Sequence, residues 1–303
     1  MRRRAELALA GITVLWGSTF VIVKGALADI SPLLFIALRF SLAAVALGLV
    51  YGAMLHRKGL HKKALLAGFL AGWLLFAAFT LQTTGLGLTT PSKSAFLTSL
   101  SIPMVPLAGS LVYGTRPRLL EGAGIAMASV GMILMTFPGN LLSAAGFNMS
   151  RGDFLTFLCA ILFALHIVVV GHFSPIVGFE SLAVLQIAIA SALALFCVGL
   201  VPTFGHTLTF HPTPGLITAI VVTGLLATGL AFTTMAWAQQ FTSSTRAALI
   251  FALEPVVAWL TSWLLTGEAM ENRGKAGAGL ILAGVLLVEF RPELKRFNRE
   301  GHH

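Results

Sequence analysis

The chain consists largely of long apolar stretches joined by short polar connections. A membrane-spanning helix needs about 20 consecutive, mostly apolar residues, and on that scale the sequence predicts ten spans. They are expected at residues 5–27, 32–55, 64–88, 92–113, 119–137, 153–172, 179–202, 214–238, 244–265 and 275–290. Only 10% of the residues are charged, whereas a soluble domain carries about 25%. The polar surface is therefore too small to cover a core in water, and we expect an all-α polytopic membrane protein.

The net charge of +9 does not indicate nucleic-acid binding, because most lysine and arginine residues form short clusters between the apolar stretches. Such clusters set topology in membrane proteins, since cytoplasmic connections are enriched in positive charge. With a cytoplasmic N-terminus, thirteen of these residues fall on the inner side: Arg2, Arg3, Arg4, Arg57, Lys58, Lys62, Lys63, Arg116, Arg118, Arg291, Lys295, Arg296 and Arg299. The outer side then holds three, which are Arg151, Arg273 and Lys275. The asymmetry predicts that both termini are cytoplasmic.

The longest connection, residues 138–152, divides the chain into two similar halves. We expect a first repeat at 1–137, a second at 153–291 and a cytoplasmic tail at 292–303. Because each half has five spans, an odd number, the second half must enter the membrane upside down relative to the first. Ten helices in a 5+5 inverted repeat are typical of secondary transporters, whose substrate site lies near mid-membrane between the repeats.

One motif aligns the two halves. An offset of 152 residues places Pro103 over Pro255 and Ala95 over Ala247. At that offset Glu254 corresponds to an apolar residue of the first half, so the halves are expected to share a fold and to differ in chemistry.

Three segments carry a resemblance to a known family. WGSTF at 16–20, TTPSKSAFLTSLSIPMVPL at 89–107 and QQFTSSTRAALIFALEPVVAWLTSWLLTGE at 239–268 resemble the EamA family of the drug/metabolite transporter superfamily. The resemblance implies ten helices, an inner-membrane location and export of metabolites or amino acids. The chain departs from the pattern in its first half, where Arg116 stands at the position matching Glu268, and no role is carried over to Glu121.

Ionisable residues inside membrane spans cost about 2.5–3.5 kcal/mol each on insertion scales, so they face protein or a wet cavity and are candidates for function. Six are expected at such depth: Lys24, Arg39, Lys93, His166, Arg246 and Glu254. Glu254 has two interpretations. It is either a proton-binding site or a fixed partner of a cation from another helix, with Lys93 or Arg39 as the candidates. Arg39 itself is expected to tether loops or carbonyl groups.

Three prolines interrupt the matching spans of the two halves. Pro103, Pro106 and Pro255 each remove a helical N–H and free a carbonyl group one turn earlier. Free carbonyl groups at membrane depth must meet water, side chains or a solute. The functional hypothesis is a hinge beside a polar cavity, and the alternative is a static kink satisfied by serine or threonine.

Lys93 and Arg246 lie near the starts of equivalent spans. A helix N-terminus is already electropositive, so a further positive charge there predicts a nearby carboxylate or an anionic solute. Because the halves are inverted, the two residues are candidate gates at opposite membrane faces. The alternative is that both side chains extend to the interface.

A cavity between the halves is expected to combine aromatic and polar side chains, which suits an organic solute. Its candidate lining residues are Trp16, Ser18, Gln82, Ser101, His166 and Trp237. The alternatives are interfacial packing for each tryptophan and a satisfied core position for the single histidine.

These features predict a secondary transporter that exports small organic metabolites, such as amino acids, by alternating access. A passive facilitator and a permease for drugs or nucleosides are alternatives, whereas a lipid-modifying enzyme would need a catalytic cluster that the sequence lacks. No cofactor or metal site is expected. The expected partners are a small-molecule substrate and membrane lipid, with protons as a candidate coupling ion. Small residues such as Gly124/Ala128 and Gly279/Ala283 predict close packing within a monomer, or a weak homodimer.

Overall fold

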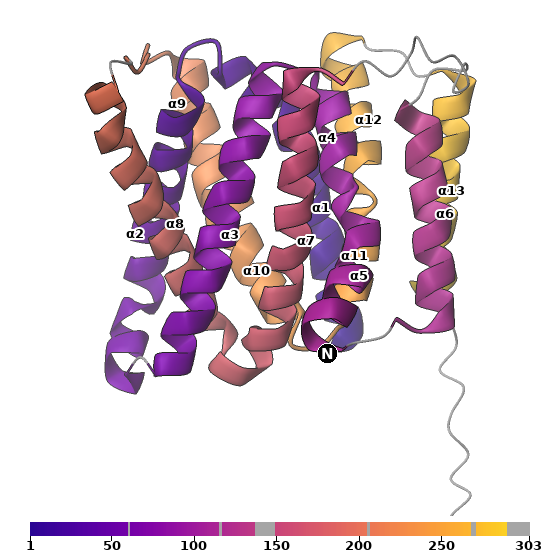
Figure 1. The fold of residues 1–303 in the computed structure, drawn as a ribbon, viewed down its shortest axis with the longest axis horizontal. Helices are drawn as coiled ribbons and strands as arrows, with labels where there is room; N and C mark the ends of the chain where they lie inside the picture. Colours follow the sequence, from indigo (N-terminus) through magenta and orange to yellow (C-terminus); the bar gives the residue numbers. More distant parts are fainter. Residues whose placement is uncertain (60, 115–116, 137–148, 205–206, 268–270, 290–303) are drawn as a thin grey trace, which may run out of the picture.

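The computed structural model describes residues 1–59, 61–114, 117–136, 149–204, 207–267 and 271–289, and within them the chain is a bundle of roughly parallel and antiparallel helices (Figure 1). One isolated bridge between Ile30 and Phe210 joins two loops. The expected all-α class is therefore confirmed for this part of the chain. Most of the expected 138–152 linker, the whole 292–303 tail and the end residues 137, 290 and 291 of the expected repeats lie outside the described residues.

The helices begin and end close to the expected spans. They are α1 (Arg2–Ala26), α2 (Pro32–Lys58), α3 (Lys62–Gly87), α4 (Pro91–Ser99), α5 (Ser101–Tyr113), α6 (Leu119–Thr136), α7 (Arg151–Val177), α8 (Phe179–Leu200), a short 3₁₀ turn η1 (Val201–Phe204), α9 (Pro214–Val221), the π-helical η2 (Val222–Leu230), α10 (Ala231–Ala238), α11 (Ser244–Phe251), α12 (Glu254–Thr266) and α13 (Asn272–Glu289). Proline stands in the first turn of several of them, where no N–H partner is lost.

Eight helical stretches of the described chain are long and apolar enough to cross a membrane, and a ninth apolar stretch, Leu119–Met135, is shorter. Five of the eight are single helices, two join a pair of helices, as α4 does with α5 and α11 with α12, and one joins α9, η2 and α10. The chain is therefore a polytopic membrane protein.

The two joined pairs break close to the prolines. The break between α4 and α5 falls at Leu100, three residues before Pro103, and Pro106 lies inside α5. The break between α11 and α12 covers Ala252 and Leu253, directly before Glu254 and Pro255. Each interruption therefore lies at mid-span, where the sequence predicts free carbonyl groups.

Helix bounds repeat along the chain at a spacing of 153 residues. The N-cap Thr90 of α4 corresponds to the N-cap Ser243 of α11 (243 − 90 = 153). The left-handed C-cap Gly114 of α5 corresponds to Gly267 of α12 (267 − 114 = 153). The expected offset of 152 is thus one residue short, because Pro103 is the third residue of α5 and Pro255 is the second residue of α12.

Helices of the first half pack mainly against helices of the second half. The main neighbours of α3 are α7 and α8, α2 packs mainly against α8, and α1 packs mainly against α12. At the right edge of Figure 1, α6 and α13 lie side by side and make few contacts with other helices. Gly131 and Gly277 allow this contact, since a Cβ atom on Gly131 would lie 2.5 Å from the carbonyl oxygen of Gly277. The close packing expected at Gly124 is also found, since a Cβ atom on Gly124 would lie 2.8 Å from the carbonyl oxygen of Gly284, whereas Gly279 has open space beside it.

Candidate functional site

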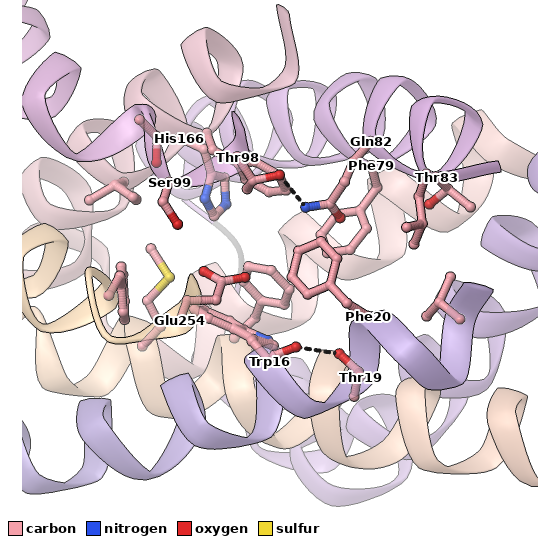
Figure 2. Close-up of a pocket in the computed structure, with 18 of the residues that line it drawn as sticks. Trp16, Thr19, Phe20, Phe79, Gln82, Thr83, Thr98, Ser99, His166 and Glu254 are labelled. Atoms are coloured by element: carbon pink, nitrogen blue, oxygen red, sulfur yellow. Dashed lines mark hydrogen bonds between the residues drawn. The ribbon is translucent and has the colours of Figure 1, made fainter. Parts of the chain in front are cut away.

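A central cavity lies between the helices of the two halves, and its volume is about 750 Å³ including the open solvent at its mouth. Its lining residues come from α1 to α5, α7 and α10 to α12. Figure 2 shows polar and aromatic side chains facing one another across it. Equivalent positions face it from both halves, because Phe79 and Phe232, which differ by 153, both line the cavity.

Aromatic rings form much of the cavity wall. The Trp16 ring lies 5.2 Å from the rings of both Phe232 and Phe251, measured between centroids. Phe79 lies 5.9 Å from Phe232 and 5.3 Å from Phe163, with its ring edge-on to both. Such contacts fix the rings in place, so the wall is a preformed apolar surface.

The π-helical turn η2 holds two of the wall residues. The indole Nε1 of Trp16 donates to the carbonyl oxygen of Ala227 at 2.9 Å. Arg39 donates from Nε to Thr228 Oγ1 and from Nη2 to the same Ala227 oxygen at 3.3 Å, and its guanidinium lies 4.5 Å from the centroid of the Phe79 ring. A π-helical turn often marks a functional site, because its hydrogen bonds depart from the α-helical pattern. The expected role of Arg39 as a tether to carbonyl groups agrees with these contacts.

Glu254 is the first residue of α12, and its carboxylate points into the cavity (Figure 2). Gly17 allows α1 to approach this position, since a Cβ atom on Gly17 would lie 2.8 Å from the carbonyl oxygen of Glu254. Within the described residues, no hydrogen bond or ion pair engages the Glu254 carboxylate. The hypothesis that Glu254 is a fixed partner of Lys93 or Arg39 is therefore wrong, because Lys93 pairs with Asp153 and Arg39 binds η2.

The cavity brings together five of the residues that the sequence singled out: Trp16, Gln82, Ser101, His166 and Glu254. Gln82 donates to Thr98 Oγ1 at 3.1 Å. His166 is buried, with Nε2 2.9 Å from Gln186 Oε1 and with Nδ1 unpartnered within the described residues.

Two other candidates do not line the cavity. The Ser18 hydroxyl donates to the Leu15 carbonyl oxygen within α1, at 2.8 Å. The Trp237 ring packs against Phe241, with 5.6 Å between centroids. Both side chains are satisfied elsewhere, which explains why helix position alone misplaced them. The hinge candidates Pro103, Pro106 and Pro255 also lie outside the lining.

The Lys93 cluster, which consists of Thr89, Lys93 and Asp153, lies where α4 and α7 begin. Lys93 Nζ is 2.6 Å from Asp153 Oδ2, and the Thr89 hydroxyl donates to Asp153 Oδ1 at 3.0 Å. Asp153 also completes the capping box of α7 with Ser150. The carboxylate that the sequence predicts near Lys93 is therefore present, and it comes from the other half.

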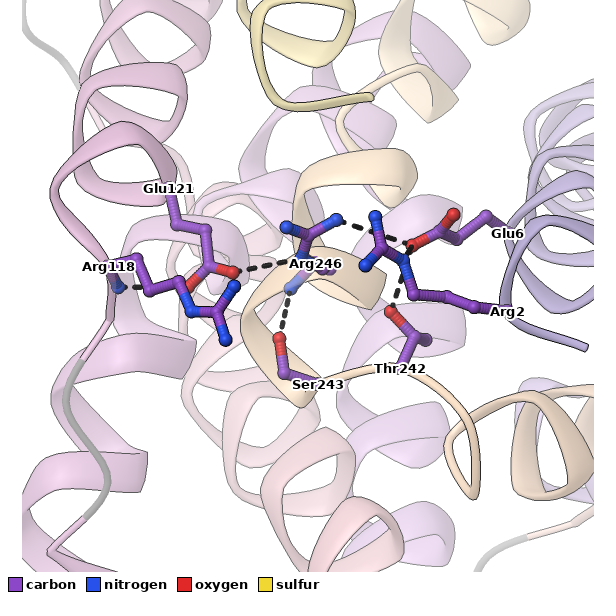
Figure 3. Close-up of polar contacts among 7 residues, drawn as sticks. All are labelled: Arg2, Glu6, Arg118, Glu121, Thr242, Ser243 and Arg246. Atoms are coloured by element: carbon purple, nitrogen blue, oxygen red, sulfur yellow. Dashed lines mark hydrogen bonds and ion pairs between the residues drawn. The ribbon is translucent and has the colours of Figure 1, made fainter. Parts of the chain in front are cut away.

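The Arg246 cluster consists of Glu6, Glu121, Thr242 and Arg246 (Figure 3). It lies at the opposite ends of the helices, because Glu6 is near the start of α1, whereas Lys24 at the end of α1 contacts Leu86 and Gly87, close to Thr89. Arg246 Nε is 2.9 Å from Glu121 Oε1, and Nη1 is 3.5 Å from Glu6 Oε1. Glu6 also accepts from Thr242 Oγ1 at 3.4 Å and pairs with Arg2 at 3.0 Å. Arg246 and Lys93 hold equivalent places, since the backbone N–H of each donates at 3.3 Å to the N-cap side chain of its helix.

The sequence interpretation missed the three carboxylates of these clusters. Glu6 lies inside an expected span, and Asp153 begins one, so the rule on ionisable residues at membrane depth could have found both. Glu121 was set aside because it does not match the family position of Glu268. An aromatic wall is expected from the sequence, but its phenylalanine residues were missed, because phenylalanine is frequent throughout the chain and carries no distinctive spacing.

The cavity extends further toward the Lys93 cluster than toward the Arg246 cluster. Its lining reaches Leu86, three residues before Thr89. On α1 it ends at Trp16, ten residues from Glu6, or roughly 15 Å at 1.5 Å per residue. In the part of the chain that the structure describes, no group of three or more metal-ligating side chains is present.

Comparison with known proteins gives the family. The sequence profile of the EamA-like transporter family matches residues 3–137 and again residues 150–290. A protein of Archaeoglobus fulgidus named an uncharacterized transporter is 31% identical, over 96% of this chain and 87% of its own length. YedA of Escherichia coli, named an inner membrane transporter, is 26% identical over 93% of this chain and 89% of its own length. A probable amino-acid metabolite efflux pump of Salmonella typhimurium is 27% identical over 98% of both chains.

A solved crystal structure shares the fold, with a TM-score of 0.72 and 22% identity, and the match covers 95% of this chain and 97% of that one. The family profile covers both halves of the chain, in agreement with the WGSTF, TTPSKSAF and STRAALIFALEP segments noted in the sequence. The chain therefore belongs to the EamA-like transporter family.

Proposed function

We propose that the chain is a secondary transporter that moves a small organic solute across the bacterial inner membrane by alternating access. The observation that carries the proposal is the central cavity. It has an aromatic wall, holds an unpaired carboxylate, and receives side chains from both halves. A preformed apolar pocket with a few polar groups is the usual form of a site for an organic solute.

The two halves are proposed to be inverted repeats of five spans each. The 153-residue spacing of helix bounds and the two family matches, 3–137 and 150–290, support this arrangement. Inverted repeats place a solute site near mid-membrane and allow equivalent elements to open it in turn to each side.

The Lys93 and Arg246 clusters are proposed as the two gates. Each joins the start of one broken span to the start of α7 or α1 from the other half, and each lies beyond one end of the cavity. We propose that the N-terminus and the Arg246 cluster lie on the cytoplasmic side, and the distribution of lysine and arginine supports this orientation. In this arrangement the described conformation has its cavity extended toward the outer side.

Amino acids or related metabolites are the proposed cargo, and export is the proposed direction. The printed name of the Salmonella relative supports this choice. The solute is proposed to cross unchanged, and the membership of the chain in a family of transporters supports this proposal. Protons are the candidate coupling ion, with the unpaired Glu254 carboxylate as the place where one would bind.

The test is solute movement into proteoliposomes that contain the purified full-length protein. A panel of amino acids, nucleosides and cationic drugs is supplied, with and without an imposed pH gradient. We expect counterflow of at least one amino acid, and acceleration by the gradient if protons are coupled. Equal rates with and without the gradient would leave a passive facilitator, and movement of no solute would contradict the transporter proposal. The orientation is tested by replacing His61 with cysteine. Labelling of that cysteine from the outer side would contradict the proposed cytoplasmic position of this connection.

A further inference from the structure

Among the described residues that line the cavity, Glu254 is the one ionisable side chain whose polar atoms make no hydrogen bond or ion pair. Among the lining residues, Arg39 and His166 are the other ionisable side chains. Arg39 is only 3% exposed, and Thr228, the Ala227 carbonyl group and the Phe79 ring already occupy its guanidinium. Among the described residues, a solute that enters therefore meets a carboxyl group with no protein partner and meets no exposed positive group.

The surroundings of Glu254 favour a cation of a particular shape. The rings of Trp16, Phe232 and Phe251 line the cavity together, with the Trp16 ring 5.2 Å from each of the other two between centroids. Aromatic faces attract ammonium groups, most strongly where water is excluded. The Trp16 indole is held in place by the Ala227 carbonyl oxygen, so its ring does not need to reorganise when a solute binds.

The two halves differ at the position that Glu254 occupies in the second half. Ser101 is the residue equivalent to Glu254 (254 − 101 = 153), and it also lines the cavity. The first half thus contributes a hydroxyl group where the second half contributes a carboxylate. Thr98 and Ser99, which precede Ser101 in the chain, add two further hydroxyl groups to the cavity lining. Hydroxyl groups can accept or donate hydrogen bonds but cannot neutralise an anion.

We infer that the cavity recognises its solute through a positively charged amine, which pairs with Glu254 while an aromatic or branched apolar body lies against Trp16, Phe232 and Phe251. The inference rests on the proposed transport function and deepens it. An amino acid then binds through its ammonium group, its carboxylate is not required, and simple amines of similar shape are also ligands.

Three probes with the same phenyl body test this inference on the purified full-length protein. Phenethylamine carries the ammonium group alone, L-phenylalanine carries ammonium and carboxylate, and 3-phenylpropionate carries the carboxylate alone. Affinity is measured by quenching of tryptophan fluorescence and by calorimetry. We expect phenethylamine to bind at least as tightly as phenylalanine, and 3-phenylpropionate to bind weakest.

Glu254→Gln should weaken phenethylamine binding at least about tenfold, which is the usual cost of losing a charge-assisted hydrogen bond. Glu180→Gln makes the same change in the first turn of α8, outside the cavity, and should leave the affinity unchanged. Size-exclusion profiles of both variants check that each protein is folded.

Three results would overturn the inference: no binding of phenethylamine to the unaltered protein, equal binding of 3-phenylpropionate, or unchanged phenethylamine affinity in Glu254→Gln. These results leave the transporter proposal standing if any solute of the proteoliposome panel crosses the membrane. If no solute crosses but phenethylamine binds through Glu254, the amine site stands and the transport function fails.

Discussion

The Lys93 and Arg246 clusters occupy equivalent places at opposite ends of the bundle, and they differ in how far water reaches them. The Lys93 side chain is 44% exposed, whereas that of Arg246 is 10% exposed. Lys93 has one carboxylate partner, and Arg246 has two, from Glu6 and Glu121. A partly exposed ion pair contributes about 0–1 kcal/mol, while removing one partner of a buried pair costs roughly 3–5 kcal/mol. In the proposed gating arrangement, the Arg246 end is therefore expected to be held more firmly than the Lys93 end.

The largest effect is expected from Arg246→Met. The substitution leaves the buried Glu121 without Arg246 and leaves the buried Glu6 with Arg2 as its remaining cationic partner among the described contacts. We therefore expect a loss of roughly 3–5 kcal/mol in the stability of the described conformation. Lys93→Met should cost about 1 kcal/mol or less. Thermal unfolding of the two purified variants measures the difference, and an equal fall in melting temperature would contradict the comparison.

A second effect concerns which end of the cavity admits water. In a background with serine at Cys159 and Cys197, cysteine replaces either Gln82 in the cavity or Leu9, which is buried between the cavity and Glu6. We expect a membrane-impermeant maleimide to label the Gln82→Cys protein and to spare the Leu9→Cys protein. Adding Arg246→Met should make position 9 reactive, and Lys93→Met should not.

Much of this arrangement could be predicted from the sequence, because hydropathy sets span length and positive charges next to helix N-termini require an anion. Which carboxylates pair with Arg246 could not be predicted from the sequence. Glu6 and Arg246 are 240 residues apart, and only the packing of α1 on α11 brings them together. The cavity residues show the same limit. Trp16 and Glu254 follow from polarity and depth, whereas Ser18 and Trp237 depend on helix rotation, which a nearly uniform apolar pattern does not fix.

A third and smaller effect comes from the Lys93–Asp153 pair itself. A double-mutant cycle with Lys93→Met and Asp153→Asn should give a coupling energy of about 0.5–1 kcal/mol, the range for exposed pairs. The coupling should shrink in high salt, because a charge that water reaches is screened. A coupling that is independent of salt would show that the pair is shielded in the membrane.

The smallest effect is expected from replacing the threonine of each cluster with valine. Here the larger loss of stability is expected in the Lys93 cluster and the smaller one in the Arg246 cluster. Thr89 donates to Asp153 at 3.0 Å, and Thr242 donates to Glu6 at the longer distance of 3.4 Å. Thr89→Val should therefore cost about 1 kcal/mol, and Thr242→Val less. Transport rates and melting temperatures of the two variants check this order, and a larger effect of Thr242→Val would contradict it.

The packing of each half against the other determines which parts can move as rigid bodies. Because α6 meets α13 through Gly131 and Gly277, and α3 lies against α7 and α8, the largest interfaces join helices of different halves. Rotating residues 3–137 as one block against residues 150–290 would break all of these contacts together. A motion that preserves them carries α6 with α13, and α2 and α3 with α7 and α8. Under the proposed alternating access, the units that move would therefore be mixed from both halves of the chain.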